Sequence, residues 1–177
     1  KSLDQYIAEH PYSPNEATLQ VSANLFDIAS LKEQYNKIKV HNLDSLGISG
    51  DLHYGGEGQI KFKANPNLKP VHRFPHKKDD DNTGCPVIFE SPYKNQNAQV
   101  PANLYIACHD PYGQSQSADS RSLGSVYILK RPNNLSTPDD IIVASYVGRP
   151  ATSDEFNRNL FMLADYYNAK IGFENDR

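Results

Sequence analysis

Three short apolar segments after Pro101 constrain the fold of this chain more than any other feature. They span residues 103–108, 124–129 and 140–147, and turn-forming residues such as proline, glycine and asparagine separate them. Apolar runs of this length between turn signals are typical of β-strands. Their connections are short enough for antiparallel neighbours, so the sequence predicts a three-strand meander.

A helix and one more strand are expected after the meander. The sequence TSDE at residues 152–155 is a capping box, which typically opens a helix. Apolar side chains then recur at helical spacing, at Phe156, Leu160, Leu163 and Tyr167. Residues 169–174 read as a fourth strand. A helical crossover after an antiparallel meander favours a mixed sheet, so we predict an α/β fold with a parallel fourth strand.

The residues before the meander read as a lead-in of helices, short strands and turns. A capping box with proline at residues 13–16 opens one helical segment, and Asp27 is placed to cap a second helix. Residues 52–54 and 59–63 are separated by glycines and predict a β-hairpin. Residues 87–89 form a short apolar run that is consistent with one more strand.

Composition excludes several classes of protein. No apolar run approaches the roughly 18 residues that a membrane span needs, and two cysteines in 177 residues make no disulfide framework. Seven Phe and eleven Tyr supply enough apolar surface for a core, so a wholly disordered chain is excluded. The formal net charge of -3 argues against a non-specific nucleic-acid binder, which usually carries a basic surplus.

Basic residues nonetheless gather between residues 59 and 78, where no acidic residue occurs. They are Lys61, Lys63, Lys69, Arg73, Lys77 and Lys78. Two interpretations stay open: the solvated face of a hairpin, or a surface that contacts a phosphate backbone. Arg149 is likewise either a phosphate contact or part of the turn before the predicted helix.

Two carboxylates stand at the ends of predicted strands. Asp110 follows the first strand of the meander and Glu174 ends the fourth strand, so parallel pairing would bring them to the same end of the sheet. Like charges at close range are costly unless a cation neutralises them, and oxygen ligands suit Mg²⁺ or Mn²⁺. A pair of such ions clamps the attacking and leaving oxygens in phosphodiester cleavage. A turn aspartate and a solvated glutamate would give the same spacing, which leaves the metal site a hypothesis.

Several phrases of the sequence resemble the nuclease domain of phage large terminases, the motors that package viral DNA. They are YIACHDPY at 105–112, VASYVGRP at 143–150 and YYNAKIGFEN at 166–175. Upstream, YSPNEA at 12–17 and NLF at 24–26 are similar to the segment that joins the family's ATPase to its nuclease. The G-x-x-x-x-G-K-[ST] phosphate loop of such an ATPase does not occur in this sequence.

The resemblance implies a ribonuclease H-like fold. Residues 1–100 would be a linker region with helices and short strands, and residues 101–177 a partial nuclease domain. Asp110 matches the metal-binding carboxylate of the family's first strand and Glu174 that of its fourth, with two Mg²⁺ or Mn²⁺ ions expected in the complete domain. A further acidic ligand belongs to a helix beyond Arg177, so we expect a catalytically incomplete piece of a longer protein.

The same resemblance implies a metal-dependent endonuclease that cuts double-stranded DNA. The basic residues at 61, 63, 73, 77, 78 and 149 would then contact the DNA. A portal, a small terminase subunit and a location in the cytoplasm of a bacterial host follow from such a role, and no membrane association is expected. Two alternatives stay open: a non-catalytic DNA- or partner-binding module with this fold, and another ribonuclease H-like enzyme such as a resolvase or transposase.

Overall fold

The chain divides into two compact units, residues 1–44 and 45–177. The structure, a computed structural model, describes residues 27–40, 46–71, 80–112 and 122–173. Within the first unit it describes one helix, α3 (Ile28–Val40). The elements of the second unit are, in chain order, β1 (Ile48–Tyr54), the 3₁₀ turn η2 (Gly56–Gly58), β2 (Ile60–Ala64), β3 (Pro86–Ile88), β4 (Tyr105–Asp110), β5 (Gly124–Lys130), β6 (Ile141–Gly148), α4 (Ser153–Tyr167) and β7 (Lys170–Phe173).

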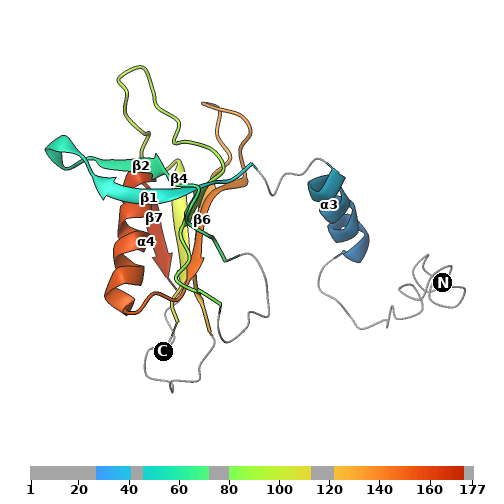
Figure 1. The fold of residues 1–177 in the computed structure, drawn as a ribbon. Coiled ribbons are helices and arrows are strands. Elements are labelled where there is room, and N and C mark those ends of the chain that lie inside the picture. Colours follow the sequence, from blue (N-terminus) through green and yellow to red (C-terminus); the bar gives the residue numbers. More distant parts are fainter. Residues whose placement is uncertain (1–26, 41–45, 72–79, 113–121, 174–177) are drawn as a thin grey trace, which may run out of the picture. The chain divides into compact units, whose positions relative to one another are not determined.

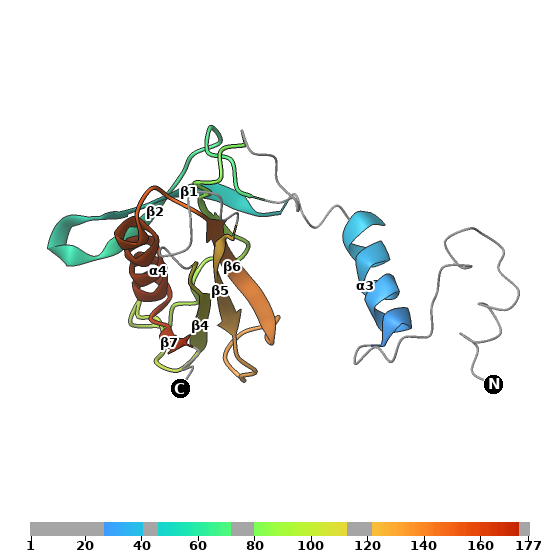
Figure 2. The same cartoon turned by 90° about the horizontal axis from the view of Figure 1, so that it is seen from below.

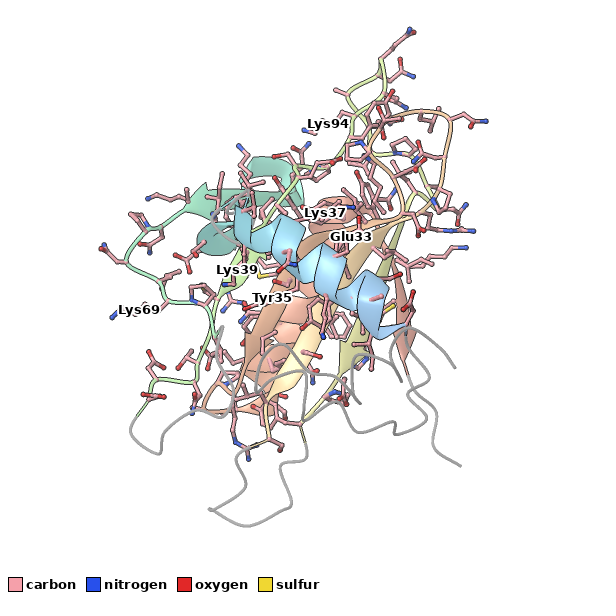
Figure 3. The ribbon with its side chains drawn as sticks, turned by 90° about the vertical axis from the view of Figure 1, so that its right-hand side faces the viewer. Glu33, Tyr35, Lys37, Lys39, Lys69 and Lys94 are labelled. Atoms are coloured by element: carbon pink, nitrogen blue, oxygen red, sulfur yellow. The ribbon has the colours of Figure 1, made fainter. Side chains whose placement is uncertain are left out.

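Helix α3 begins where the sequence predicts. The Asp27 carboxylate accepts hydrogen bonds from the main-chain N–H of Ala29 at 3.0 Å and from the Ser30 hydroxyl at 2.6 Å. The bond from Ala29 satisfies a main-chain donor that the first helical turn leaves unpaired, and the Ser30 and Ala29 bonds together lower the pKa of Asp27. Lys37 pairs with Glu33 one turn earlier at 2.8 Å, on the exposed surface of the helix (Figure 3).

The strands of the second unit form one mixed sheet with the order β2-β1-β3-β6-β5-β4-β7 (Figure 1). Strands β4, β5 and β6 form an antiparallel meander, α4 crosses over, and β7 pairs with β4 in parallel. Every other neighbouring pair is antiparallel. The predicted meander, crossover helix and parallel fourth strand are therefore confirmed, and the unit is an α/β unit.

The lead-in strands belong to the same sheet as the meander. The predicted hairpin is confirmed as β1 and β2, with Gly50 opposite Ala64 and Tyr54 opposite Ile60. The third short strand, β3, pairs with β1 on one side and with β6 on the other. The division expected between residues 100 and 101 thus falls inside the second compact unit, which begins at Ser45.

Helix α4 covers one face of the sheet and closes the core (Figures 1 and 2). Its buried residues include Phe156 and Tyr167, which pack edge-on against buried tyrosines. The ring of Tyr105 on β4 lies 5.0 Å from that of Tyr167. Aromatic side chains bury large areas, so these rings supply much of the apolar surface that holds the helix on the sheet.

The ends of α4 and the start of β4 follow from single residues. Thr152 accepts a hydrogen bond from the N–H of Glu155 at 3.2 Å, as the capping box predicts, and Asn168 ends the helix in the left-handed conformation. Asn103 also has a positive φ of 63°. This backbone conformation interrupts an extended strand, so β4 begins at Tyr105 rather than at the predicted residue 103.

Candidate functional site

Asp110 is the last residue of β4, and its side chain is exposed. It lies opposite Ser125 of β5 in the antiparallel register. Along β4, Tyr105 and Ala107 are buried in the core with α4. Because successive side chains of a strand point to opposite faces, Asp110 lies on the sheet face away from α4. The carboxylate is therefore accessible at the edge of a rigid element.

Strand β7 runs beside β4 in parallel, with Phe173 opposite His109. Parallel neighbours end at the same edge of a sheet, so the C-terminal ends of the two strands meet. Glu174 is the next residue of the sequence after Phe173 and lies outside the described residues. The parallel pairing on which the carboxylate hypothesis depends is confirmed, while the position of Glu174 stays a prediction.

Arg149 packs into the same end of the sheet. Its Nη1 donates to the main-chain carbonyl of Ser122 at 2.7 Å and to the Ser122 hydroxyl at 3.2 Å. Its guanidinium lies over the ring of Tyr112, 4.6 Å from the centroid. The Tyr112 hydroxyl in turn donates to the carbonyl of Pro150 at 3.0 Å. Arg149 thus connects the turn before α4 to Ser122, just before β5, and to Tyr112, just after β4.

Lys61 and Lys63 lie on β2, at the other edge of the sheet, and both are exposed. Four strands separate β2 from β4, and Phe62, between the two lysines, packs against Tyr166 near the end of α4. The other predicted DNA contacts, Arg73, Lys77 and Lys78, lie outside the described residues. Of the described basic residues, Arg149 therefore lies at the same end of the sheet as Asp110, whereas Lys61 and Lys63 lie on the edge strand β2.

The register nevertheless places Lys61 and Lys63 on the same sheet face as Asp110. Lys63 pairs with Asp51, which shares a strand face with Ser49 two residues earlier. Ser49 pairs with Val87, and Val87 pairs with Ser145. Ser145 pairs with Tyr127, and Tyr127 pairs with Cys108. Cys108 precedes Asp110 by two residues and shares its face. One face of the sheet thus carries exposed lysines at one edge and an exposed carboxylate near the other.

Metal-binding groups are sparse around Asp110. Within residues 27–40, 46–71, 80–112 and 122–173, no three His, Cys, Asp or Glu side chains come close enough to hold an ion. His109 lies on the opposite strand face from Asp110, and its Nδ1 is buried with no hydrogen-bond partner among those residues. The exposed Asp110 carboxylate, whose oxygen atoms suit Mg²⁺ or Mn²⁺, therefore needs further ligands to hold an ion.

An ion pair with one buried and one partly exposed partner joins the end of β5 to the loop after β3. Lys130, the last residue of β5, is fully buried, and its Nζ lies 2.5 Å from Oε1 of Glu90. The Tyr167 hydroxyl donates to the main-chain carbonyl of Glu90 at 2.5 Å. A lysine at a strand end reads as solvated, and its partner is 40 residues away, so the sequence offers no local signal for this contact.

In the part of the chain that the structure describes, neither α3 nor α4 is long and apolar enough to cross a bilayer. Comparison of the chain with known protein families, with curated proteins and with solved structures found no match. The likeness to the terminase nucleases therefore remains a prediction from the sequence.

Proposed function

We propose that the second unit is a ribonuclease H-like nuclease unit that acts on double-stranded DNA in a viral packaging motor. One observation carries this proposal: β4, which ends in Asp110, is the parallel neighbour of β7, which directly precedes Glu174 in the sequence. The strand order β6-β5-β4-β7 with α4 as the crossover supports the ribonuclease H-like assignment. The portal, the small terminase subunit and the bacterial cytoplasm belong to the same proposal.

Asp110 and Glu174 would hold Mg²⁺ or Mn²⁺, together with an acidic residue from outside this sequence. Bound ions of this kind activate water for attack on phosphorus and stabilise the leaving oxygen. The chain itself contributes a carboxylate whose position is fixed by strand pairing on one side, to β5, and on the other, to β7. Such fixed placement on rigid elements is what a two-ion site requires.

The sheet face that carries Asp110 would be the face that meets DNA. Lys61 and Lys63 are exposed on β2, and the register places them on the same sheet face as Asp110. A duplex lying across the sheet would therefore reach Lys61 and Lys63 while one of its phosphates approached Asp110. Arg149 is engaged with Ser122 and Tyr112 and would act by shaping this end of the sheet.

Titration of the 177-residue chain with Mn²⁺ tests the metal site. Paramagnetic Mn²⁺ should broaden the amide resonances of His109, Asp110 and Phe173 before others, and Asp110→Asn should abolish this effect. Asp140→Asn is the matched control, because Asp140 is an exposed aspartate with a positive φ that asparagine tolerates. Equal broadening of these amides in the Asp110→Asn and the unchanged proteins would refute the proposed site.

Cleavage is tested with a protein that contains this unit and the further acidic ligand that the family resemblance implies. Asp110→Asn should reduce Mn²⁺-dependent nicking of supercoiled DNA by at least a hundredfold, while Asp140→Asn leaves it within twofold. DNA binding without any metal-dependent cleavage by the unchanged protein would instead support the non-catalytic binding module. Equal cleavage by the Asp110→Asn and unchanged proteins would contradict a catalytic role for this carboxylate.

A further inference from the structure

A groove of about 640 Å³ lies at the opposite end of α4 from Asp110. Three segments line it: the hairpin turn before β2, the loop between β3 and β4, and the last turn of α4. Figure 3 labels Lys94, which lies on the loop between β3 and β4. The lining residues that bear on its chemistry are Gln59, Ser91, Lys94, Asp165 and Tyr166. Its volume falls within the range of small-ligand sites.

The loop wall of this groove is held in place by buried groups. Glu90, just before the wall, pairs with the buried Lys130, and its carbonyl accepts from Tyr167. The main-chain N–H of Tyr93 donates to the hydroxyl of the fully buried Tyr105 at 2.9 Å. The buried Lys130 ammonium needs this counter-charge, so the contact fixes the position of the loop at Glu90.

The far side of the loop is fixed as well. The Nδ2 of Asn168, the residue that ends α4, donates to the carbonyl of Val100 at 3.0 Å. Between these anchors, the Asn95 side chain accepts from the N–H groups of Asn97 and Gln99, both at 3.0 Å. Lys94 therefore projects from a loop that is pre-organised on both sides.

The lining of the groove includes groups of opposite charge. Asp165 lies in the last turn of α4, which contains no basic residue, so its charge adds to the negative end of the helix dipole. Lys94 supplies a positive charge from the loop. Tyr166 lies next to Asp165 in the lining, and burial raises the pKa of its hydroxyl, so that group stays neutral. Within the described residues, the structure shows no ion pair for the Asp165 carboxylate or the Lys94 ammonium.

We propose that this groove binds a protein segment that presents an arginine side chain next to an acidic one. The guanidinium would face Asp165, the C-terminal end of α4 and the Tyr166 ring, because a carboxylate and an aromatic face are the two partners that arginine engages best. The acidic neighbour would meet Lys94. A nucleic acid is disfavoured, since Asp165 and the helix end repel phosphate.

This site is independent of the proposed nuclease site. Asp110 ends β4 beside the start of α4, where Tyr112 contacts Phe156, whereas the groove lies beside the end of α4. The inference goes beyond the proposed function, because it assigns a partner-binding surface that DNA cleavage does not need. Failure of metal binding at Asp110 would leave it intact.

A short peptide probe tests the groove on the 177-residue chain. In an NMR titration, acetyl-Gly-Arg-Glu-Gly-amide should shift the amide signals of Lys94, Asp165 and Tyr166 saturably. Replacing the arginine of the probe with citrulline, which removes only the charge, should weaken binding at least tenfold. Asp165→Asn should weaken it equally, and Lys94→Ala should weaken it for this probe but not for a probe with glutamine in place of glutamate.

Asp154→Asn is the matched control, since Asp154 is an exposed aspartate in the first turn of the same helix. It should leave the affinity within twofold. Equal affinity of the unchanged and Asp165→Asn proteins would overturn the proposal. So would saturable shifts of the same amides by the oligonucleotide d(T)8 in the absence of any shift by the peptide.

Discussion

The ammonium of Lys130, which is fully buried, lies 2.5 Å from the carboxylate of Glu90, which is 30% exposed. This contact joins the end of β5 to the residues that follow β3, two parts of the chain that are 40 residues apart. The two partners differ in their access to water. Because of that difference, removing one partner should not have the same effect as removing the other.

Glu90→Gln should destabilise the second unit more than Lys130→Met does. The first change leaves a buried ammonium without its counter-charge, which costs about 3–5 kcal/mol. The second leaves a carboxylate that water can partly solvate, and the methionine fills the buried volume. Urea unfolding followed by circular dichroism measures both. The double variant should be more stable than Glu90→Gln alone, and equal losses in the two single variants would show that the burial difference has no energetic consequence.

Lys61→Ala and Lys63→Ala should each weaken DNA binding and change its dependence on salt. A lysine that contacts a phosphate releases a counterion, so each substitution should reduce the slope of log K against log salt by about 1. Fluorescence anisotropy with a 20-base-pair duplex at several salt concentrations measures this slope. Arg158→Ala is the control, because Arg158 is an exposed cation on α4, which covers the other sheet face. An unchanged slope for both lysine variants would place the DNA elsewhere.

The stability of the second unit should fall between pH 10 and pH 12. Burial of Tyr146 raises the pKa of its hydroxyl from 10.0 to about 12, so the folded state keeps the proton that the unfolded state loses. This contribution is fully present below pH 10 and is lost as pH rises to about 12. A shift of this size corresponds to about 3 kcal/mol.

Tyr146→Phe isolates this contribution. The variant should lose part of the decline in stability above pH 10, which urea unfolding at pH 8 to 11.5 measures. Tyr127→Phe is the matched control, because Tyr127 is 40% exposed. Burial also raises the pKa values of Cys85, Tyr105 and Tyr167, which are present in both the Tyr146→Phe and the unchanged proteins. The test is therefore the difference between the stability curves of these two proteins against pH. Parallel curves would contradict the prediction.

Local patterns in the sequence predict the elements of this fold well. The alternation and length of apolar runs locate β4, β5, β6 and β7, and the capping residues Asp27 and Thr152 locate the starts of both helices. These signals work because capping and strand formation depend on neighbouring residues. The bounds are less accurate: β1 begins at Ile48 rather than at residue 52, and β4 begins two residues after the predicted start because Asn103 has a positive φ.

Contacts between distant segments were not predictable in the same way. Nothing local indicates that β3 inserts between β1 and β6, or that Lys130 is buried against Glu90. For the candidate site, the sequence predicted that Asp110 ends a strand with a parallel neighbour, because strand order and the crossover helix limit the topology. It left open whether Lys61 and Lys63 face the same side, which only the register across six strands decides.

Gly124→Ala tests how tightly the Asp110 end of the sheet is packed. Gly124 begins β5, one residue before Ser125, the partner of Asp110. A Cβ there would lie 2.5 Å from the Phe156 ring and 3.0 Å from the Tyr112 ring. Both rings pack against each other in the core, so neither moves freely, and we expect a loss of about 1–3 kcal/mol in urea unfolding.

Gly56→Ala is the control for this substitution, because a Cβ at Gly56 would meet nothing within 4 Å. Its stability should stay within about 0.5 kcal/mol of the unchanged protein. Since Tyr112 follows Asp110 by two residues, the displacement of its ring in Gly124→Ala should also weaken the Mn²⁺ effect on the Asp110 amide. A Gly124→Ala protein with unchanged stability would mean that the rings of Phe156 and Tyr112 give way easily, and that Asp110 is held by strand pairing alone.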